Sequence, residues 1–248
     1  MEGTALLGRL NWHLAEVVDV VMETARVKTL ALDVRDWPGH RAGQHVDIRL
    51  TADDGYQAER SYSIGSAPHA AHVELTVERL DDGEVSPYLT EVLRPGDELE
   101  LRGPVGGYFV WEPGLAGPVL LVAGGSGVVP LMAMIRERAA AGSDVDMRLL
   151  YSSRSWDDVI YRKELERLSG SGLTVVHTLT RSRPDGWTGY ARRVDQEMLG
   201  EVGPDPAARP NAYVCGPTPF VEAVATALVG LGHEPSRIKT ERFGATGG

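Results

Sequence analysis

Short hydrophobic runs rich in β-branched residues alternate with polar turn segments through the first half of the chain. This pattern predicts strands over residues 17–21, 27–34, 45–50, 60–64, 73–79 and 98–103. Turn residues separate the runs, as in Arg94-Pro95-Gly96-Asp97. Six short strands at this spacing are typical of a small antiparallel barrel. One helix interrupts them over residues 86–93, with Ser86 as the expected N-cap and Pro87 as the first helical residue.

The pattern changes after Pro113-Gly114. A continuously apolar strand over residues 119–123 leads into a glycine turn and an apolar helix over 130–141. Further strands are predicted over 147–152, 173–180 and 212–215, with helices over 156–168 and 219–231. Because strands and helices alternate, we expect right-handed crossovers and a parallel sheet. The predicted fold class is an N-terminal antiparallel β-barrel (residues 1–113) followed by a C-terminal parallel-sheet α/β domain (residues 118–248).

Composition adds limits to this picture. The chain has 248 residues, of which 42% are hydrophobic, and this suits two globular domains. No apolar run reaches the ~20 residues of a membrane span, and the N-terminus lacks a signal-peptide pattern, so we expect a cytoplasmic protein without membrane insertion. The single cysteine excludes an internal disulfide and a four-cysteine iron–sulfur site. The seven histidines show no metal-ligand spacing, so no metal is expected.

The formal charge of −10 is concentrated in the first half of the chain. Residues 1–116 hold ten Lys and Arg against twenty Asp and Glu, whereas residues 117–248 hold fifteen of each. This balance argues against nucleic acid as a partner. The neutral second half is the relatively basic one and suits a phosphate-rich ligand, although ordinary solvated surfaces also explain the total charge.

Arg60-Ser61-Tyr62-Ser63 places a cation, an aromatic ring and a hydroxyl on one predicted strand. A flavin needs these three groups: a cation for its pyrophosphate, a flat ring against the isoalloxazine and a small hydroxyl near N5. Adjacent residues point to opposite faces of a strand, so Tyr62 and Ser63 meet one flavin only if its ring lies at the strand's edge. A surface ion pair of Arg60 and a packed barrel aromatic at Tyr62 are the structural alternatives.

Two further segments suit anions. Gly83-Glu84-Val85-Ser86 ends in a hydroxyl at a predicted helix start, which is also the pattern of a plain capping motif. Gly124, Gly125 and Gly127 follow a buried strand and precede the helix that contains Pro130. Glycines there let the backbone approach a pyrophosphate, and the helix N-terminus adds unpaired N–H groups. Tight strand–helix packing is the alternative, and the spacing is not the G-x-G-x-x-G of the Rossmann fingerprint.

The ends of the predicted parallel strands carry the next candidates. Cys215 precedes Gly216-Pro217, a turn that leaves it at the carboxyl edge of the sheet, where α/β sheets bind ligands. A small core residue is the alternative reading of a lone cysteine. Ser153 and Arg154 follow the second parallel strand, and Arg181 follows the third, where a nucleotide domain holds the adenosine ribose. Arg and Ser suit a 2′-phosphate, so we expect NADPH over NADH, although an arginine can also stack on adenine.

Taken in order, these segments and Glu241-Arg242-Phe243 resemble the ferredoxin–NADP⁺ reductase family over nearly the whole chain. The resemblance implies an FAD-binding barrel and an α/β domain that binds NADP(H), with NAD(H) as the other nucleotide considered. It also implies that the turn from Gly83 to Ser86 holds the flavin pyrophosphate opposite Arg60. The glycine loop, in its G-G-x-G-x-x-P form, resembles the family's nicotinamide-nucleotide loop.

By the same resemblance, Ser63, Cys215 and Glu241 are the catalytic residues. The Cys215 sulfur would lie near the nicotinamide C4, and the Glu241 carboxylate, unless it is an ordinary exposed acid, would relay protons. Phe243 would cover the flavin face that the nicotinamide must occupy. Phe243 stands where plant-type members have tyrosine, and five residues follow it, so this end of the chain departs from the family's pattern.

The implied reaction is hydride transfer from NAD(P)H to FAD, followed by delivery of single electrons to an external carrier such as a ferredoxin or an oxygenase component. The carrier is expected to be external because 248 residues and one cysteine leave no room for a globin or four-cysteine domain. Ferredoxins are commonly acidic, so docking would need a basic patch, for which Arg192 and Arg193 are candidates. Two alternatives are an NAD(P)H:flavin reductase that uses diffusible flavin and a non-catalytic electron-transfer subunit.

Overall fold

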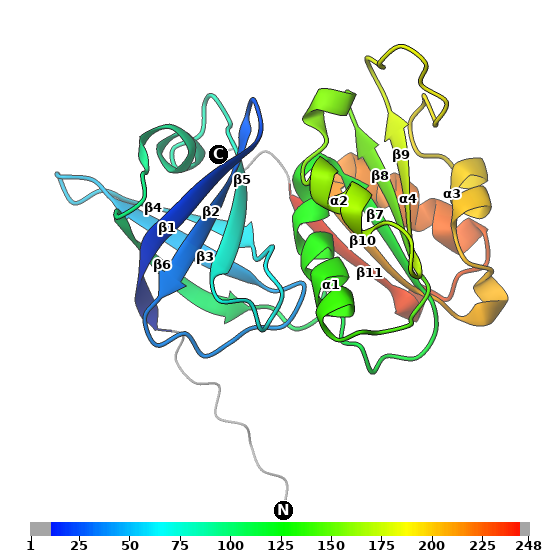
Figure 1. Cartoon of the computed structure of the whole chain (residues 1–248), viewed down its shortest axis with the longest axis horizontal. Helices are drawn as coiled ribbons and strands as arrows, with labels where there is room; N and C mark the ends of the chain where they lie inside the picture. The colour runs from blue at the N-terminus through cyan, green and yellow to red at the C-terminus, as the bar shows by residue number, and fades with distance from the viewer. Residues whose placement is uncertain (1–10, 244–248) are drawn as a thin grey trace, which may run out of the picture.

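The computed structural model describes residues 11–243, which form two domains side by side (Figure 1). The predicted absence of a signal peptide concerns residues 1–10, which lie outside the described residues, as do the five residues after Phe243. The first domain contains β1 (Trp12–Thr24), β2 (Val27–Val34), β3 (His45–Thr51), β4 (Gln57–Ser63), β5 (Val73–Glu78) and β6 (Glu98–Val105).

These six strands form an antiparallel sheet in the order β4-β3-β6-β1-β2-β5. A bridge between Ile64 and Leu75 joins the two edges of the sheet, so the sheet closes into a barrel. Alternate residues of each strand point inward, and Leu30, Leu32 and Ile48 are fully buried in the barrel core. The antiparallel barrel predicted from the hydrophobic pattern is confirmed.

A short helical segment lies between β5 and β6, as predicted, but the Ser86 side chain does not cap it. The π-helix Tyr88–Val92 has no side-chain cap at its N-terminus. The Ser86 hydroxyl oxygen instead accepts a hydrogen bond of 3.0 Å from the Leu80 N–H. The predicted N-cap role of Ser86 is therefore wrong, because the turn after β5 folds back and presents the Leu80 amide to this hydroxyl.

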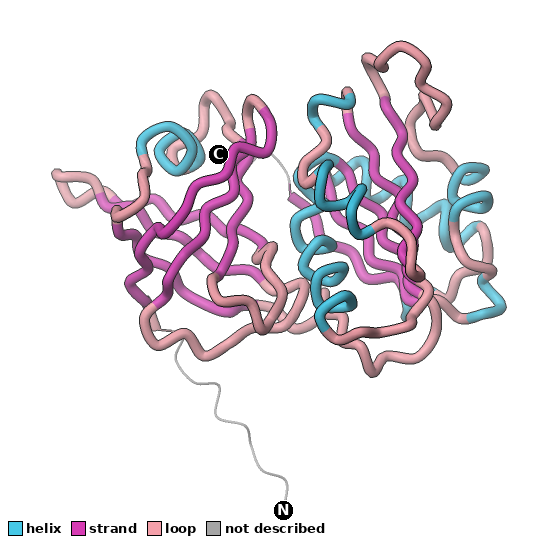
Figure 2. The backbone as a smooth tube through the Cα atoms, viewed as in Figure 1, coloured by secondary structure: helices cyan, strands magenta, loops and turns pink. Residues whose placement is uncertain are grey.

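The second domain is a parallel sheet covered by helices on both faces (Figure 2). Its strands, in the order β11-β10-β7-β8-β9, are β7 (Val119–Gly124), β8 (Met147–Ser153), β9 (Leu173–Leu179), β10 (Asn211–Pro217) and β11 (Ile238–Phe243). Its helices are α1 (Val128–Ala140), α2 (Arg162–Leu168), α3 (Gln196–Val202) and α4 (Thr218–Gly230). Leu121 of β7 packs in the cluster that contains α1 and α2, whereas the adjacent Leu120 packs in the cluster that contains α3 and α4. A strand buried on both faces must be apolar throughout, as the sequence of β7 is.

Three local features differ from the predicted elements. Helix α3 was not expected. Its N-cap is Asp195, whose side chain accepts a hydrogen bond of 2.9 Å from the Met198 N–H. The helix expected over residues 156–168 is broken, with a 3₁₀ turn at Trp156–Asp158 and a left-handed residue, Tyr161, before α2. Strand β10 continues through Gly216-Pro217, where a turn was expected.

The remaining 3₁₀ turns are Gly125–Gly127, Pro206–Ala208 and Pro235–Arg237. Among residues 11–243, no helix is long and apolar enough to cross a membrane.

Candidate functional site

The carboxyl ends of the five parallel strands meet at one edge of the α/β sheet. β7 ends at Gly124, β8 at Ser153, β10 at Pro217 and β11 at Phe243, so this edge brings together most of the candidates from the second half of the sequence. Loops from distant parts of the chain meet at this edge and can surround one ligand.

The glycine loop at the end of β7 lies directly on the end of β10. A Cβ atom at Gly127 would lie 2.2 Å from the Cys215 carbonyl oxygen, so only glycine fits at this contact. Gly125 has a φ of +57°, in the left-handed region, and its Cβ side is open, with no atom within 4 Å. Helix α1 starts immediately after the loop, with Pro130 buried in its first turn.

Two other glycines at this edge are required by close packing. The ring of Phe220 would lie 2.9 Å from a Cβ at Gly124 and 2.8 Å from a Cβ at Gly216. The same added Cβ at Gly216 would lie 3.2 Å from the Gly124 Cα atom. Close packing, the alternative considered for the glycine loop, thus applies at Gly124, whereas the side of Gly125 is open.

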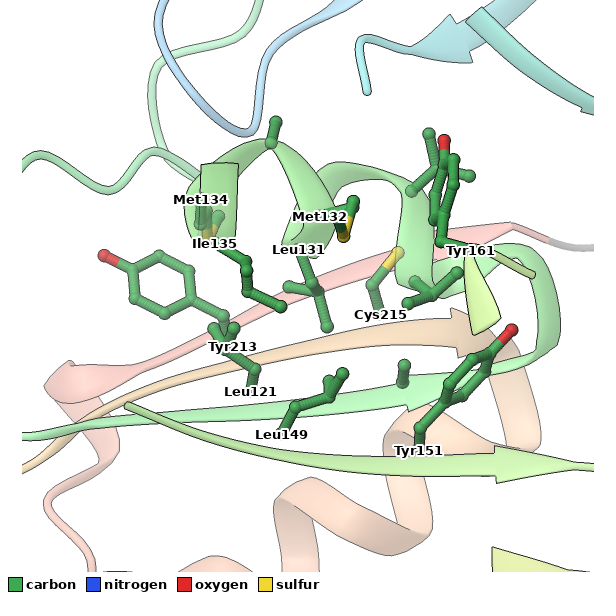
Figure 3. Close-up of a cluster of buried hydrophobic side chains, with 14 of the residues drawn as sticks. Leu121, Leu131, Met132, Met134, Ile135, Leu149, Tyr151, Tyr161, Tyr213 and Cys215 are labelled. Atoms are coloured by element: carbon green, nitrogen blue, oxygen red, sulfur yellow. The ribbon is translucent and has the colours of Figure 1, made fainter. Parts of the chain in front are cut away.

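Cys215 and Glu241 are neighbours at this edge, because they are partners in the parallel pairing of β10 with β11. Cys215 is 1% exposed and lies beneath α1 with Leu131 and Met132 (Figure 3). Burial, together with the nearby Glu241, raises the pKa of its thiol well above the usual value. Burial also raises the pKa of Glu241 to about 7, and its Oε2 atom has no hydrogen-bond partner among residues 11–243. Glu241 is therefore not the ordinary exposed acid considered from the sequence.

The ends of β8 and β9 hold the candidates for the adenosine side. Ser153 is buried and Arg154 is exposed, and the Arg154 carbonyl oxygen accepts a hydrogen bond of 2.9 Å from the Arg181 N–H. This bond brings the two arginine-bearing loops side by side. Neither the Arg154 nor the Arg181 guanidinium forms an ion pair with another residue of the 11–243 segment, so both cations remain available to an anion.

In the barrel, Arg60 pairs with a carboxylate of the neighbouring turn. Arg60 Nη2 lies 2.6 Å from Glu84 Oε2, and the Tyr56 hydroxyl donates a hydrogen bond of 2.8 Å to Glu84 Oε1. Arg60 Nη1 also donates to the Glu59 carbonyl oxygen at 2.7 Å. The turn that begins at Gly83 thus does face Arg60, as predicted, but through Glu84 and not through Ser86.

Tyr62 and Ser63 lie at the end of β4, paired with Val46 and His45 of β3. Tyr62 packs against the barrel core, and its burial raises the pKa of the phenol to about 12. Tyr62 therefore has the barrel packing considered from the sequence, with part of its surface still exposed. Within residues 11–243, no hydrogen bond joins Tyr62 or Ser63 to the edge of the α/β sheet.

A hydrogen bond between the domains was missed by the sequence analysis. The Ser126 hydroxyl of the glycine loop donates to Glu78 Oε2 at the end of β5, at 2.8 Å. Glu78 is the last residue of β5, and the sequence contained no signal that its carboxylate would reach the other domain. The bond places the glycine loop of the α/β domain against the barrel.

The side chains of both domains fit nucleotide ligands. Arg60 has five N–H donors, and its recorded bonds to Glu59 and Glu84 leave others for a phosphate. The open side of Gly125 at the start of α1 provides room and backbone N–H groups for a second phosphate-bearing ligand. Within the described part of the chain, no group of three or more His, Cys, Asp or Glu side chains is arranged to hold a metal ion.

Two protein families match the chain, one for each domain. Residues 13–110 match the oxidoreductase FAD-binding domain, and residues 121–226 match the oxidoreductase NAD-binding domain. The two matches divide the chain where the barrel gives way to the parallel sheet.

Individual relatives extend across both domains. The glycine betaine monooxygenase reductase subunit of Chromohalobacter salexigens is 36% identical over 242 residues, and the match covers 94% of this chain but only 65% of that relative's length. NADH-cytochrome b5 reductase 1 of Aspergillus terreus is 31% identical over 237 residues, which cover 92% of this chain and 79% of the relative. Among solved structures, the flavohem-like FAD/NAD-binding domain of nitric oxide dioxygenase from Vibrio cholerae matches with a TM-score of 0.84 and 25% identity, covering 94% of this chain and 98% of that one.

Proposed function

The chain belongs to the ferredoxin–NADP⁺ reductase-like family of FAD- and NAD-binding oxidoreductases, and from this premise we propose that it is an NAD(P)H-dependent reductase that delivers electrons to an external protein acceptor. FAD, when bound, would accept a hydride from the nicotinamide and release electrons singly. In this proposal, residues 1–113 form the FAD-binding domain and residues 118–248 the NAD(P)-binding domain.

The hydrogen bond between Ser126 and Glu78 is the observation that carries the proposal. Ser126 belongs to the glycine loop, and Glu78 ends the strand that leads into the turn facing Arg60. A reaction between two cofactors requires that their reacting atoms come within about 3–3.5 Å. The bond supports such a meeting, because it brings the nucleotide loop of one domain against the flavin-binding half of the other.

The barrel residues would bind and orient the flavin. Arg60, with the turn from Gly83 to Ser86, would hold the pyrophosphate, and Tyr62 and Ser63 would seat the ring. Charge-assisted hydrogen bonds from a guanidinium are among the strongest contacts to phosphate. Because Glu84 already pairs with Arg60, we expect the phosphate to compete with this carboxylate.

The α/β residues would bind the nicotinamide nucleotide and complete the site. Gly124, Gly125 and Gly127, with Pro130 behind them, would hold its pyrophosphate at the start of α1. Gly216 and Cys215 would frame the nicotinamide, and Phe243, 37% exposed at the end of β11, would shield the flavin from water. Glu241 would hold a proton near neutral pH, because the pKa of its buried carboxyl is raised to about 7.

We expect a preference for NADPH over NADH. Ser153, Arg154 and Arg181 gather at the ends of β8 and β9, and the two guanidinium groups there suit a 2′-phosphate. The preference remains a prediction, since one relative in the family is named for NADH.

The acceptor is proposed to be an oxygenase component, with a ferredoxin as the other candidate. The support is the relative named as a monooxygenase reductase subunit, of which this chain spans only 65%. The basic patch suggested at Arg192 and Arg193 is weaker than expected, because Arg192 pairs with Asp195 at 2.7 Å and with Glu197 at 2.9 Å. A net charge of −10 favours a partner that is less acidic than most ferredoxins.

An anaerobic titration tests the main proposal. Purified protein loaded with FAD is titrated with NADPH and then with NADH, while absorbance at the flavin bands is followed. We expect the flavin absorbance to be bleached fully, and NADPH to achieve this at a lower concentration than NADH. A protein that binds no FAD and gains no diaphorase activity on adding it would overturn the proposal.

A second candidate, an NAD(P)H:flavin reductase with diffusible flavin, is favoured by the Arg60–Glu84 pair. A carboxylate 2.6 Å from the phosphate-binding cation weakens the site for FAD. Loss of all flavin on desalting, with turnover restored by added FAD, would select this alternative. Retention of stoichiometric flavin would exclude it.

A further inference from the structure

Arg136 joins the two domains. Its side chain reaches the barrel at Gly65, just after β4, the strand that would contact the flavin. Arg136 lies on α1 with its side chain 17% exposed. Its Nη1 donates to the Gly65 carbonyl oxygen at 2.8 Å and to Glu74 Oε2 at 2.6 Å, both in the barrel domain. Its Nε and Nη2 donate to the two carboxylate oxygens of Glu164 at 3.1 and 2.7 Å, within its own domain. One partly buried guanidinium therefore binds a backbone carbonyl and a carboxylate of the barrel and a carboxylate of the α/β domain.

Tyr161 completes this contact from the α/β side. The Arg136 guanidinium lies 4.9 Å from the centre of the Tyr161 ring. The Tyr161 hydroxyl is hydrogen-bonded to Thr76, and the Tyr161 N–H donates to Glu23 Oε2 at 3.1 Å, so both groups bind the barrel. A Cβ at Gly65 would lie only 2.8 Å from the Tyr161 hydroxyl oxygen. We call Gly65, Glu74, Arg136, Tyr161 and Glu164 the interdomain clamp.

The backbone of Tyr161 supports a functional reading of the clamp. Tyr161 has a φ of +58°, a left-handed conformation that residues with side chains rarely adopt. Such a conformation persists only where its surroundings hold it, and it points to a role for the contact. Here the conformation directs the Tyr161 N–H and hydroxyl to Glu23 and Thr76 at the same time.

The clamp connects the two proposed cofactor sites through rigid elements. Gly65 lies two residues after Ser63 of β4, and its N–H is bonded to the Glu74 carbonyl oxygen at 2.8 Å. Arg136 lies on the helix that begins directly after the glycine loop, and a helix transmits a displacement of one end to the other. A shift at Arg136 therefore moves the nucleotide loop relative to Tyr62 and Ser63.

We propose that Arg136 is a positioning residue that sets the distance between the flavin and the nicotinamide, an inference that rests on the proposed function. Electron-pair transfer between two cofactors depends steeply on their separation, and a misplacement of about 1 Å can cost ~100-fold in rate. Arg136 touches neither reacting group. Its role is to hold the two binding surfaces at one separation, which neither domain can do alone.

Arginine suits this position better than lysine. A planar guanidinium can bind Gly65, Glu74 and Glu164 in fixed directions, whereas an ammonium is a point charge without this geometry. Apolar contact also joins the domains, since the rings of Phe109 and Tyr213 lie 5.5 Å apart. Loss of the clamp is therefore expected to loosen the junction without separating the domains.

Three variants and a matched control test the proposal. Arg136→Met removes the clamp cation, Arg136→Lys keeps the charge, and Glu74→Ala removes only the barrel carboxylate. The control is Arg138→Met on the same helix. Arg138 is 7% exposed and, among residues 11–243, its guanidinium donates only to the Val145 and Ser171 carbonyl oxygens of its own domain, at 2.8 and 2.7 Å. Glu74→Ala keeps the test decisive if Arg136→Met fails to fold.

The first readout needs no cofactor. Hydrogen exchange is measured at the Tyr161 amide, whose N–H crosses the domain junction to Glu23. We expect faster exchange at Tyr161 in Arg136→Met and Glu74→Ala, with the amides of the barrel strands unchanged. If the Tyr161 amide exchanges at the wild-type rate in both variants, Arg136 and Glu74 do not hold the domain junction and the proposal is wrong.

The second readout is the single-turnover rate of flavin reduction by NAD(P)H, measured beside the dissociation constants of FAD and of the nucleotide. We expect the rate to fall by about 10- to 100-fold in Arg136→Met, with partial recovery in Arg136→Lys and dissociation constants within about threefold of wild type. Arg138→Met should keep the wild-type rate. If wild-type protein is reduced but the clamp variants match its rate, the positioning role is wrong. If FAD-loaded wild-type protein is reduced by neither nucleotide, the proposed function itself fails.

Discussion

Glu241 lies beside Cys215 in the register of the parallel strands β10 and β11, at the edge of the sheet where the glycine loop begins α1. Burial raises the pKa of the Glu241 carboxyl to about 7 and raises that of the Cys215 thiol well above its usual value. Both groups are therefore mainly protonated in the folded protein just below neutral pH. Two of the predictions below depend on this pair.

The first prediction concerns stability and pH. The Glu241 carboxyl has a folded pKa of about 7 against an ordinary 4.5, so the unfolded chain loses this proton first as pH rises. The proton that the folded protein holds on Glu241 therefore contributes to stability below about pH 4.5. This contribution is lost between pH 4.5 and 7, where the free energy of unfolding falls by about 3 kcal/mol in total. Glu241→Gln should remove this decline and stabilise the protein at pH 8. Denaturant unfolding of both proteins at pH 5, 7 and 8 measures the difference. Glu222→Gln, exposed and paired with Arg242, is the control that should keep the wild-type slope.

The second prediction concerns the reactivity of Cys215. A buried thiol with a raised pKa forms little thiolate, and the thiolate is the reactive species. We expect the folded protein to react with a disulfide reagent at least about 100-fold more slowly than the protein in guanidinium chloride. The single cysteine makes the signal unambiguous. Rapid labelling of the folded protein at pH 7 would show that Cys215 is accessible.

The third prediction separates the two parts of the Arg60–Glu84 pair. Arg60→Gln should weaken FAD binding by about tenfold, because it removes a charge-assisted phosphate contact, but should leave riboflavin binding unchanged. Glu84→Gln should strengthen FAD binding, because the competing carboxylate is lost. Flavin fluorescence titration gives both constants.

The matched control for Glu84 is Glu91→Gln. Glu91 pairs with Arg79 at 2.5 Å and has a similar exposure, 54% against 49% for Glu84. We expect no change in FAD affinity for this variant. If Glu84→Gln instead weakens FAD binding, Glu84 orients Arg60 for the phosphate and does not compete with it.

The fourth prediction distinguishes two glycines of the nucleotide loop. Gly127→Ala places a Cβ 2.2 Å from the Cys215 carbonyl oxygen and should cost at least about 2 kcal/mol of stability. Gly125→Ala meets no atom within 4 Å and carries only the cost of its left-handed φ, about 1 kcal/mol. The Gly125 variant should fold but bind the nicotinamide nucleotide more weakly. Unfolding curves and nucleotide titrations measured together reveal whether stability and binding separate in this way.

The fifth prediction concerns nucleotide preference. Arg154→Ala should raise the dissociation constant for NADPH by about tenfold and leave that for NADH within about threefold. The reason is that only NADPH offers a 2′-phosphate to the guanidinium. Arg167→Ala, which removes a 69% exposed arginine of α2, is the charge-matched control. Equal losses for both nucleotides would indicate that Arg154 stacks on adenine.

The fold class of each domain and most of its elements could be predicted from the sequence alone, although helix α3 was not. Alternation with a period of two identified the barrel strands, and the continuous apolar run of β7 identified a strand buried on both faces. The glycine loop could be located because glycine is favoured where the backbone has a left-handed φ or closely approaches another backbone. These signals are local, since each depends on residues that are neighbours in the chain.

Contacts between distant residues could not be predicted in this way. The family resemblance placed Arg60 opposite the turn from Gly83 to Ser86, but it gave no means to choose Glu84 over Ser86 as the partner. The sequence left Glu241 open as an exposed acid, whereas the fold leaves its side chain only partly exposed, beside Cys215 of β10.

The sequence by itself determined two domains, their fold classes and the segments that carry the candidate chemistry. Only the tertiary structure decided which charges pair, which acids are buried and how the domains meet, as the contacts of Arg136 with Gly65, Glu74 and Glu164 illustrate. The physical reason is that periodicity records which face of an element is buried. Ion pairing and desolvation depend instead on distances between groups that only the complete fold brings together.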